Sequence, residues 1–514
     1  MENKIREPSK YVKAIYDVWD NTVKNIFINA TAGSGKTTLL LSLIKRVPSF
    51  KKIIFLAFNK SIQEELNGRV TYSKNVDIKT IHSMAYSVLR QGVYERFKLN
   101  ENKTFALINK KIDLSFIDKK EGLNEQKKQK LKYSYLFELQ SILNLCHLNL
   151  VDPSDREKTK ALCEEYGYLV DELKLKNIIE ANKIVEKYNR KKNHKEFMID
   201  FTDMLYLTYT FIDQSKYPKY DCVFIDESQD LNPLQREVVM RLIGKGGRFC
   251  AVGDDFQAIY SFMGSNLESF NMLKNYKNTV SLPLSVSYRC SKSVINEAKK
   301  YDSSVEFAES AKEGIVRNGK LSEIKEGDIL LCRNNYPLVL AYVELLKQGK
   351  KAHILGRDFS RSLIAIIDKV QEYKNRENKT IEEGYDFILN EKFQELKDKG
   401  ILNPFNNKLY QSFKEKIDII KELVLYFGSI EKTLSNLENV FSDSYGDGVK
   451  LMTIHKSKGL ESKRVFILGF RELIPSKYAE TELELYQEKC LQFVAVTRAK
   501  EELVYLPLSE VNID

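Results

Sequence analysis

A glycine-rich segment near the start of the chain has the residue types needed to bind the phosphates of a nucleotide. Residues 30–38 read ATAGSGKTT and lie between an apolar run at 26–28 and an apolar, helix-patterned stretch at 39–44. This order of strand, loop and helix is that of a P-loop, whose backbone N–H groups and helix N-terminus present positive charge to a phosphate. Lys36 would add a full charge at the β- and γ-phosphates, and the hydroxyl of Thr37 would coordinate Mg²⁺. The predicted nucleotide-binding residues are Ala32, Gly33, Ser34, Gly35, Lys36, Thr37 and Thr38.

An acidic pair much further along the chain complements this loop. Residues 224–230 read FIDESQD, and Asp226 and Glu227 follow a strand-like run at 222–225. Open parallel sheets place ligands beyond the carboxyl ends of their strands, so both carboxylates would face the phosphates. Asp226 suits Mg²⁺, which prefers hard oxygen ligands, and Glu227 could polarise the attacking water. Alone, such a pair is commonly a solvated turn; beside a P-loop it predicts hydrolysis of a nucleoside triphosphate with Mg²⁺ bound.

Composition limits the class of protein. The length of 514 residues predicts several domains, and 43% hydrophobic residues supply ample core. The net charge of +10 favours a polyanionic partner without requiring one. The charged first ten residues and the lack of a long apolar run predict neither secretion nor membrane insertion. Seven scattered cysteines, never spaced as C-x-x-C, indicate a reducing intracellular compartment and no zinc or iron–sulfur site.

Two sets of strand-like runs alternate with helical patterns. The first set comprises 26–29, 53–58, 222–225 and 249–252, and the second comprises 328–332, 353–355, 451–453 and 465–468. This alternation predicts the α/β class with two parallel-sheet domains, each interrupted by a mainly helical insertion. The expected boundaries are 1–84 and 197–290 for the first domain, 291–357 and 449–514 for the second, and 85–196 and 358–448 for the insertions.

Further short motifs follow in a fixed order. They are LAFNKSIQEEL at 56–66, KTIHS at 79–83, VGDDFQAIYSFMG at 252–264, LSVSYRC at 284–290, MTIHKSKGLE at 452–461 and QFVAVTRAK at 492–500. With the P-loop and the acidic pair, this succession resembles the superfamily-one helicases of the UvrD/Rep type over about residues 25–505. The resemblance implies two RecA-like domains with ATP in the cleft between them and single-stranded DNA across their top. The MTIHKSKGLE form resembles the branch that moves 3′ to 5′.

The resemblance also implies roles for single residues. Gln257 would sense the γ-phosphate, and Arg289 and Arg498 would be arginine fingers. Tyr288 would stack on the base of the nucleotide, and Glu461 would contact its ribose. The residues implied to meet single-stranded DNA, or to couple it to the nucleotide, are Phe58, Thr80, His82, Tyr260, Phe262, Thr453 and His455. Aromatic faces accept any base, so they would grip the strand without sequence preference.

Alternatives to a strand-separating motor remain open at this stage. A single-stranded DNA translocase that strips proteins or remodels junctions without processive unwinding would carry the same motifs. A P-loop switch would need the guanine signature N-K-x-D, whereas residues 59–62 read NKSI. A binding-only module would have lost a catalytic group, and none is missing. Residues 10–17 read KYVKAIYD, without the adenine-reading glutamine usual in relatives, so strict preference for ATP stays open. The expected partners are single-stranded DNA, DNA junctions and a loading or repair protein.

Overall fold

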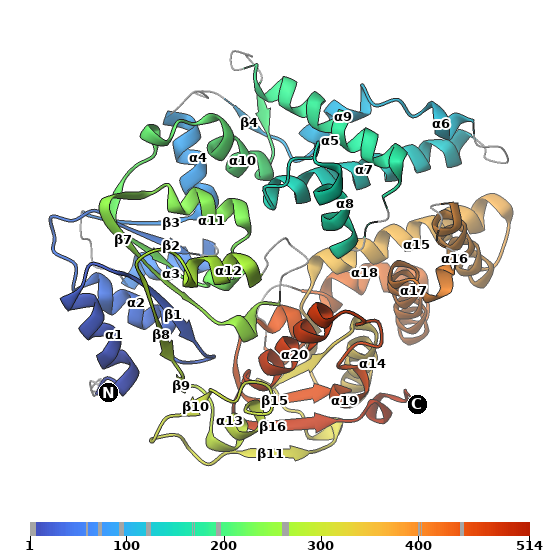
Figure 1. Cartoon of the computed structure of the whole chain (residues 1–514). Helices are drawn as coiled ribbons and strands as arrows, with labels where there is room; N and C mark the ends of the chain where they lie inside the picture. The colour runs from blue at the N-terminus through green and yellow to red at the C-terminus, as the bar shows by residue number, and fades with distance from the viewer. Residues whose placement is uncertain are drawn as a thin grey trace. The chain divides into compact units, whose positions relative to one another are not determined.

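The chain forms two compact units, each built on a six-stranded parallel sheet (Figure 1). The computed structural model describes residues 7–57, 60–69, 75–91, 97–119, 125–166, 168, 170–191, 197–259, 267–398, 401, 403–442 and 447–513. The first unit comprises Met1–Ala30 and Gly35–Leu284, and the second comprises Thr31–Ser34 and Ser285–Asp514. The predicted α/β class with two parallel sheets is therefore confirmed, as two RecA-like domains require.

The sheet of the first unit has the strand order β3-β2-β6-β7-β1-β8. Its strands are β1 (Asn25–Ala30), β2 (Ile53–Ala57), β3 (Val76–Thr80), β6 (Tyr220–Ile225), β7 (Ile243–Gly253) and β8 (Thr279–Leu284). The four strands predicted for this unit are confirmed as β1, β2, β6 and β7. The edge strands β3 and β8 were not predicted from the sequence. They are only partly buried, and β8 contains Pro283, which edge strands tolerate.

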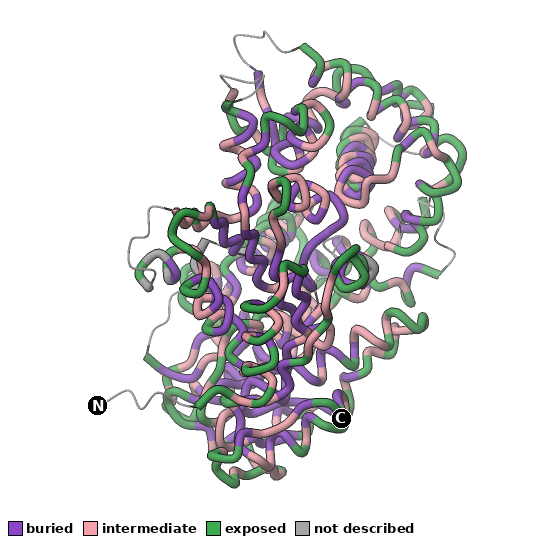
Figure 2. Tube along the Cα trace, turned by 60° about the vertical axis from the view of Figure 1, so that its left-hand side comes forward, coloured by how far each residue is buried: buried purple, intermediate pink, exposed green. Residues whose placement is uncertain are grey.

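Both faces of this sheet are covered, and the strand side chains alternate between two cores. Ile26 and Ile28 pack in one core with Leu40 of α2 (Lys36–Ile44). Phe27 points to the other core, which it shares with Leu205 of α10 (Phe201–Phe211). Strands buried on both faces need apolar residues at nearly every position, and all but one of the residues of β1 are buried. Figure 2 colours each described residue by its burial.

The sheet of the second unit has the order β11-β16-β15-β12-β14-β13. Its strands are β11 (Ile315–Asn318), β12 (Ile329–Cys332), β13 (Ala352–Ile354), β14 (Val449–Thr453), β15 (Ser462–Leu468) and β16 (Ala499–Leu506). The four predicted strands of this unit are confirmed as β12 to β15. Short parallel pairs are formed by β4 (Lys98–Leu99) with β5 (Met198–Ile199), and by β9 (Val286–Ser287) with β10 (Glu306–Phe307).

Helices cover the sheets and also form two longer helical regions, one in each unit. The first helical region contains α4 (Ile81–Gln91), α5 (Lys103–Asn109), α6 (Ser115–Asp118), α7 (Glu125–Leu148), α8 (Arg156–Glu165) and α9 (Glu172–Asn189). The second contains α15 (Arg357–Glu377), α16 (Ile381–Asp398), α17 (Lys408–Phe427) and α18 (Ile430–Val440). The other α-helices are α1 (Lys10–Asn21), α3 (Lys60–Arg69), α11 (Pro233–Met240), α12 (Leu267–Lys274), α13 (Lys292–Ala298), α14 (Asn335–Lys347), α19 (Phe470–Leu473) and α20 (Glu482–Val496).

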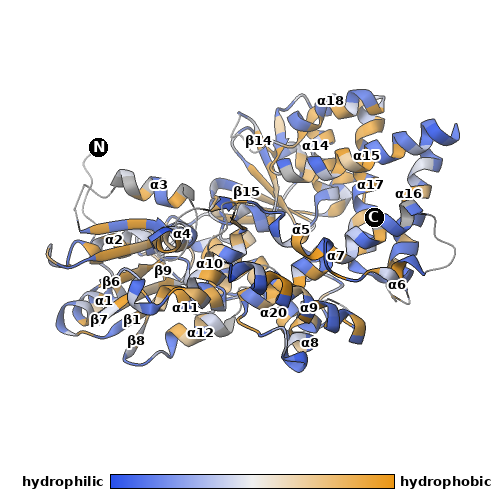
Figure 3. Cartoon of the chain, turned by 90° about the horizontal axis from the view of Figure 1, so that it is seen from above, coloured by the Kyte–Doolittle hydropathy of each residue, from blue (hydrophilic) through white to orange (hydrophobic). Residues whose placement is uncertain are grey.

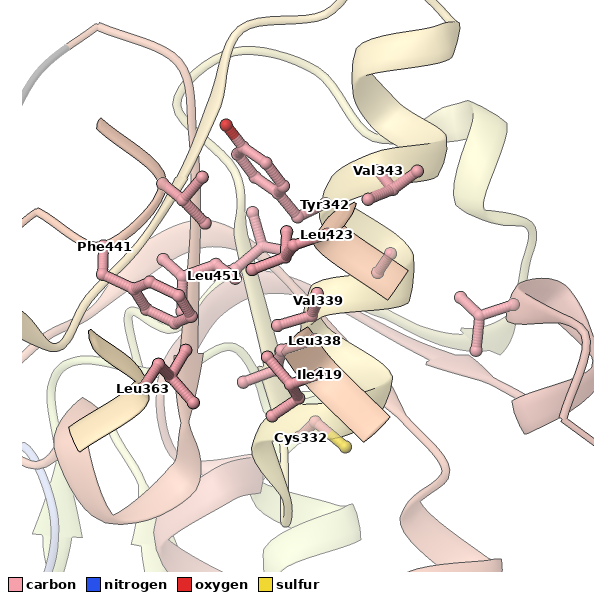
Figure 4. Packing of buried hydrophobic residues seen from close by; sticks show 14 of the residues in the cluster. Cys332, Leu338, Val339, Tyr342, Val343, Leu363, Ile419, Leu423, Phe441 and Leu451 are labelled. Atoms are coloured by element: carbon pink, nitrogen blue, oxygen red, sulfur yellow. The ribbon is translucent and has the colours of Figure 1, made fainter. Parts of the chain in front are cut away.

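The two helical regions differ in the hydrophobic core to which they belong. Leu139, Cys146 and Ile178, from α7 and α9, belong to a core that contains no residue of either large sheet. In the second unit, by contrast, Leu363 and Leu423 of the insertion helices lie in one continuous core with residues of α14 and the strands (Figure 4). The helices α15 to α18 mix hydrophobic and hydrophilic residues along their length, as one-sided packing requires (Figure 3).

Two whole-chain features follow from the described residues. All seven cysteines are buried free thiols. Within the described ranges, the helices that are long are too polar to act as bilayer spans.

Candidate functional site

The P-loop connects the carboxyl end of β1 to the start of α2. Gly35 is the N-cap of α2, and its φ of 83° is a left-handed conformation that strains residues with a Cβ. Lys36 is the first helical residue and is 9% exposed. Its Nζ donates to the carbonyl oxygen of Ala30 at 3.2 Å and lies 3.6 Å from Oδ2 of Asp254. The ammonium group is thus held at a helix N-terminus, where phosphates bind.

The other predicted P-loop residues differ in their exposure. Ala32 and Ser34 are buried, and the Ser34 hydroxyl donates to the carbonyl oxygen of Thr31 at 2.8 Å, whereas Thr38 is exposed. Within the second unit, which includes Thr31–Ser34, the backbone N–H of Tyr288 donates to the carbonyl oxygen of Gly33 at 2.9 Å.

Two oxygen groups predicted to hold Mg²⁺ meet in the first unit. The hydroxyl of Thr37 donates to Oδ2 of Asp226 at 2.8 Å, although 188 residues separate them in the chain. Asp226 is 3% exposed; its burial and the neighbouring charge of Glu227 raise the pKa of its carboxyl group. A hydroxyl and a carboxylate are hard ligands that fit Mg²⁺, and a cation beside Asp226 would favour the ionised form.

Glu227 follows Asp226 in a strained backbone conformation. Its φ of 50° and ψ of 44° are left-handed, which costs a residue other than glycine about 1–3 kcal/mol and is concentrated at functional sites. Its backbone N–H donates to Oδ1 of Asp226 at 2.9 Å. Its Oε2 accepts a hydrogen bond from Nε2 of Gln229 at 2.5 Å. The carboxylate is therefore oriented by the turn that ends β6.

Asp254, at the end of β7, joins this group although the sequence analysis did not select it. It is 2% exposed, and its carboxylate accepts a hydrogen bond from Nε2 of Gln257 and lies beside Lys36. Gln229 was also missed. The usable signal for Asp254 is the one that identified Asp226, namely a polar residue just after a buried strand of a parallel sheet.

Three of the predicted residues of the second unit, Arg289, Glu461 and Arg498, belong to one charged cluster. Glu461 accepts from Arg289 at 2.5 Å and from Lys500 at 2.6 Å. Burial alone would raise the pKa of Glu461, but the hydrogen bond from Lys500 and the charge of Arg289 lower it, so this carboxylate is ionised at neutral pH. Arg498 is 1% exposed, and its Nη1 donates to the carbonyl oxygen of Leu460 at 3.2 Å. The structure thus brings Arg289, Glu461 and Arg498 into one part of this unit.

Two of the predicted nucleic-acid residues lie where β3 meets α4. The hydroxyl of Thr80 accepts from the backbone N–H of Ser83 at 3.1 Å and so caps α4. His82 lies in the first turn of α4 and packs edge-to-face on Phe201, with ring centroids 6.1 Å apart. Phe201 is half exposed. Phe58, Tyr260 and Phe262 lie outside the described residues.

The remaining two predicted nucleic-acid residues lie at the end of β14 and just after it, in the second unit. Thr453 ends this strand, and His455 lies in the short 3₁₀ helix Ile454–Ser457 that comes next. Burial and the charge of Arg333 lower the pKa of His455 to about 4. The imidazole is therefore neutral at physiological pH.

Comparison with known proteins connects these observations to one family. Residues 15–278 match the family model described as the UvrD/REP helicase N-terminal domain. The chain is similar to the probable DNA helicase II homolog of Mycoplasma capricolum, with 24% identity over 94% of this chain and 82% of the relative. It is also similar to the ATP-dependent DNA helicase Rep of Buchnera aphidicola, with 24% identity over 93% of this chain and 92% of the relative. A third similar protein is the ATP-dependent DNA helicase PcrA of Bacillus subtilis, with 24% identity over 93% of this chain and 80% of the relative.

Proposed function

The chain belongs to the UvrD/REP helicase family, and from this we propose that it is an ATP-dependent DNA helicase that moves 3′ to 5′ along single-stranded DNA. The observation that carries the proposal is the meeting of Lys36, Thr37 and Asp226 at the carboxyl edge of the first sheet. These residues supply the ammonium group and hard oxygens that triphosphate hydrolysis requires.

Five residues of the first unit have defined roles in the proposed hydrolysis. Lys36 binds the β- and γ-phosphates, and Glu227 accepts the proton of the attacking water. Gln257 contacts the γ-phosphate. Thr37 and Asp226 would hold Mg²⁺, which when bound neutralises charge on the phosphate oxygens. The support is the packing of all five side chains around the ends of β1, β6 and β7.

Arg289 and Arg498 are the proposed arginine fingers. An arginine that reaches the transferring phosphate can raise the rate by about 10³ to 10⁵, because charge develops on the equatorial oxygens. We assign this role from the LSVSYRC and QFVAVTRAK motifs and from the pairing of Arg289 with Glu461, the proposed ribose ligand. Tyr288, which is 37% exposed, would stack on the base.

Movement along DNA follows from ATP-dependent closure of two RecA-like domains. A ligand shifts such an equilibrium only through its different affinity for the two states. Arginine fingers that engage the γ-phosphate only when the domains close would supply that difference. The aromatic residues proposed to alternately hold and release the strand are Phe58, His82, Tyr260 and Phe262. Thr80, Thr453 and His455 are proposed to contact phosphate or to couple the strand to the nucleotide. The proposed domain and insertion boundaries are those given by the sequence analysis.

A strand-displacement assay tests this proposal. A labelled duplex with a 3′ single-stranded tail should be unwound in the presence of ATP and Mg²⁺, whereas a matched duplex with a 5′ tail should not. Unwinding from the 5′ tail alone would refute the polarity. ATP hydrolysis stimulated by single-stranded DNA, without unwinding of either duplex, would favour the translocase that strips proteins or remodels junctions.

A further inference from the structure

Gln229 connects two polar groups that end neighbouring strands of the first sheet. It lies in the 3₁₀ turn Ser228–Asp230 and is 1% exposed. Its Nε2 donates to Oε2 of Glu227 at 2.5 Å, and its Oε1 accepts from the backbone N–H of Asp254 at 3.0 Å. The nitrogen of this buried amide thus bonds to the loop after β6, and its oxygen bonds to the residue that follows β7.

Gly253 makes room for this amide. A Cβ at position 253 would lie 2.5 Å from Cε2 of Phe270, 2.6 Å from the hydroxyl oxygen of Ser228 and 2.7 Å from Oε1 of Gln229. Side chains are not found so close to neighbouring atoms, so any other residue here would displace Phe270 and the turn that carries Gln229. Glycine as the last residue of β7 therefore leaves the space that the side chain of Gln229 occupies.

The contacts continue from Asp254 to the phosphate-binding residues. Its carboxylate accepts a hydrogen bond from Gln257 and lies 3.6 Å from Nζ of Lys36. A single series of buried polar contacts therefore runs from Glu227 through Gln229 and Asp254 to Gln257 and Lys36. In a buried network of this kind each group orients the next.

We propose that Gln229 is a positioning residue for ATP hydrolysis, which fixes the direction of the Glu227 carboxylate relative to Lys36 and Gln257. This inference rests on the proposed function, in which Glu227 accepts the proton of the attacking water. A general base must lie within hydrogen-bond reach of the proton that it accepts. Gln229 supplies that placement by fastening the carboxylate to the strand end beside Lys36.

Gln229→Met tests the proposal, because methionine has a similar length but neither donor nor acceptor. Loss of a hydrogen bond to a charged group predicts a fall in kcat of about 10- to 100-fold, with KM for ATP unchanged within about two-fold. Binding of a non-hydrolysable ATP analogue and of single-stranded DNA should match the wild type.

Gln235→Met is the matched control. Gln235 lies six positions further along, in α11, and its Oε1 also accepts a backbone hydrogen bond, from Asn232 at 3.1 Å. The control loses a comparable hydrogen bond but no contact with the series above. Its kcat should stay within about two-fold of the wild type, while thermal melting records how far either variant loses stability.

Gly253→Ala gives a second test, since it keeps the Gln229 amide but displaces it; because the added methyl group also crowds Phe270 of the core, thermal melting is measured beside the kinetics. The substitution should also lower kcat while preserving KM and analogue binding. Full kcat in both Gln229→Met and Gly253→Ala, beside an inactive Glu227→Gln, would overturn the role of Gln229 and leave the proposed function standing. A rise in KM without a loss of kcat in Gln229→Met would overturn it too. Wild-type turnover by Glu227→Gln would instead refute the assignment of the base.

Discussion

At the scale of single residues, the protein itself orients the groups that would act on ATP. Lys36 is held by a carbonyl oxygen and a carboxylate, and Glu227 by an amide, so neither depends on solvent for its direction. Groups fixed before the reaction need no reorganisation when charge develops in the transition state. Substitutions at these positions should therefore affect turnover more than folding.

Lys36→Ala should abolish hydrolysis and leave DNA binding intact. The ammonium group is the proposed partner of the transferring phosphate, so we expect kcat to fall by at least about 100-fold. Fluorescence anisotropy with labelled single-stranded DNA should give an affinity within about two-fold of the wild type. Lys45→Ala, at the exposed end of α2, is the control and should retain activity. Normal hydrolysis by Lys36→Ala would refute the location of the active site.

His455 predicts a pH dependence of stability. Its folded-state pKa of about 4 lies below the value of about 6.5 in an unfolded chain, so the unfolded state binds the proton more readily. The stability supplied by the neutral imidazole is complete above about pH 6.5 and is lost as the pH falls toward 4. Relative to His455→Asn, the free energy of unfolding should fall by about 1.4 kcal/mol per pH unit across this window. Urea titrations at several pH values measure the free energy of unfolding of both proteins. A difference in this free energy that does not change with pH would contradict the neutral state of His455.

At the scale of elements, the central strands could be predicted and several of their neighbours could not. Strands buried on both faces are continuous apolar runs, which made β1, β6 and β12 visible in the sequence. The partly exposed edge strands β3, β8 and β11 lack such runs. Asp226 could be found because it follows a strand in a known motif. The same signal marks Asp254, but its hydrogen bond with Gln229 could not be predicted, because it depends on β6 and β7 lying side by side, and local sequence does not encode strand pairing.

The second helical insertion should contribute to the stability of the second sheet. Leu423 of α17 is fully buried in the core that includes residues of β12 and β14. Leu423→Ala should lower the free energy of unfolding of this unit by about 2–5 kcal/mol. Hydrogen exchange should show faster exchange in β12 and β14 as well as in α17. Leu425→Ala, on the same helix but 79% exposed, should have little effect. Exchange changes confined to α15 to α18 would show that the insertion is an independent module.

At the scale of the whole molecule, DNA should control the rate at which ATP is consumed. In a helicase, ATP hydrolysis is linked to movement only if binding of the strand favours the state that hydrolyses ATP. The size of this link is a coupling free energy between the two ligands, ATP and DNA. The net charge of +10 is consistent with a polyanionic partner. The binding part of the coupling is reciprocal, so a non-hydrolysable ATP analogue should change the affinity for single-stranded DNA by the same factor as DNA changes the affinity for the analogue.

The most direct test of this account is the steady-state rate of ATP hydrolysis measured with single-stranded DNA, with RNA of the same sequence and with no polymer. We expect a low basal rate that single-stranded DNA raises by at least about fivefold, which corresponds to the lower end of a coupling of about 1–3 kcal/mol. A rate that stays the same with and without DNA would contradict it, because hydrolysis would then have no link to the strand that it is proposed to move along.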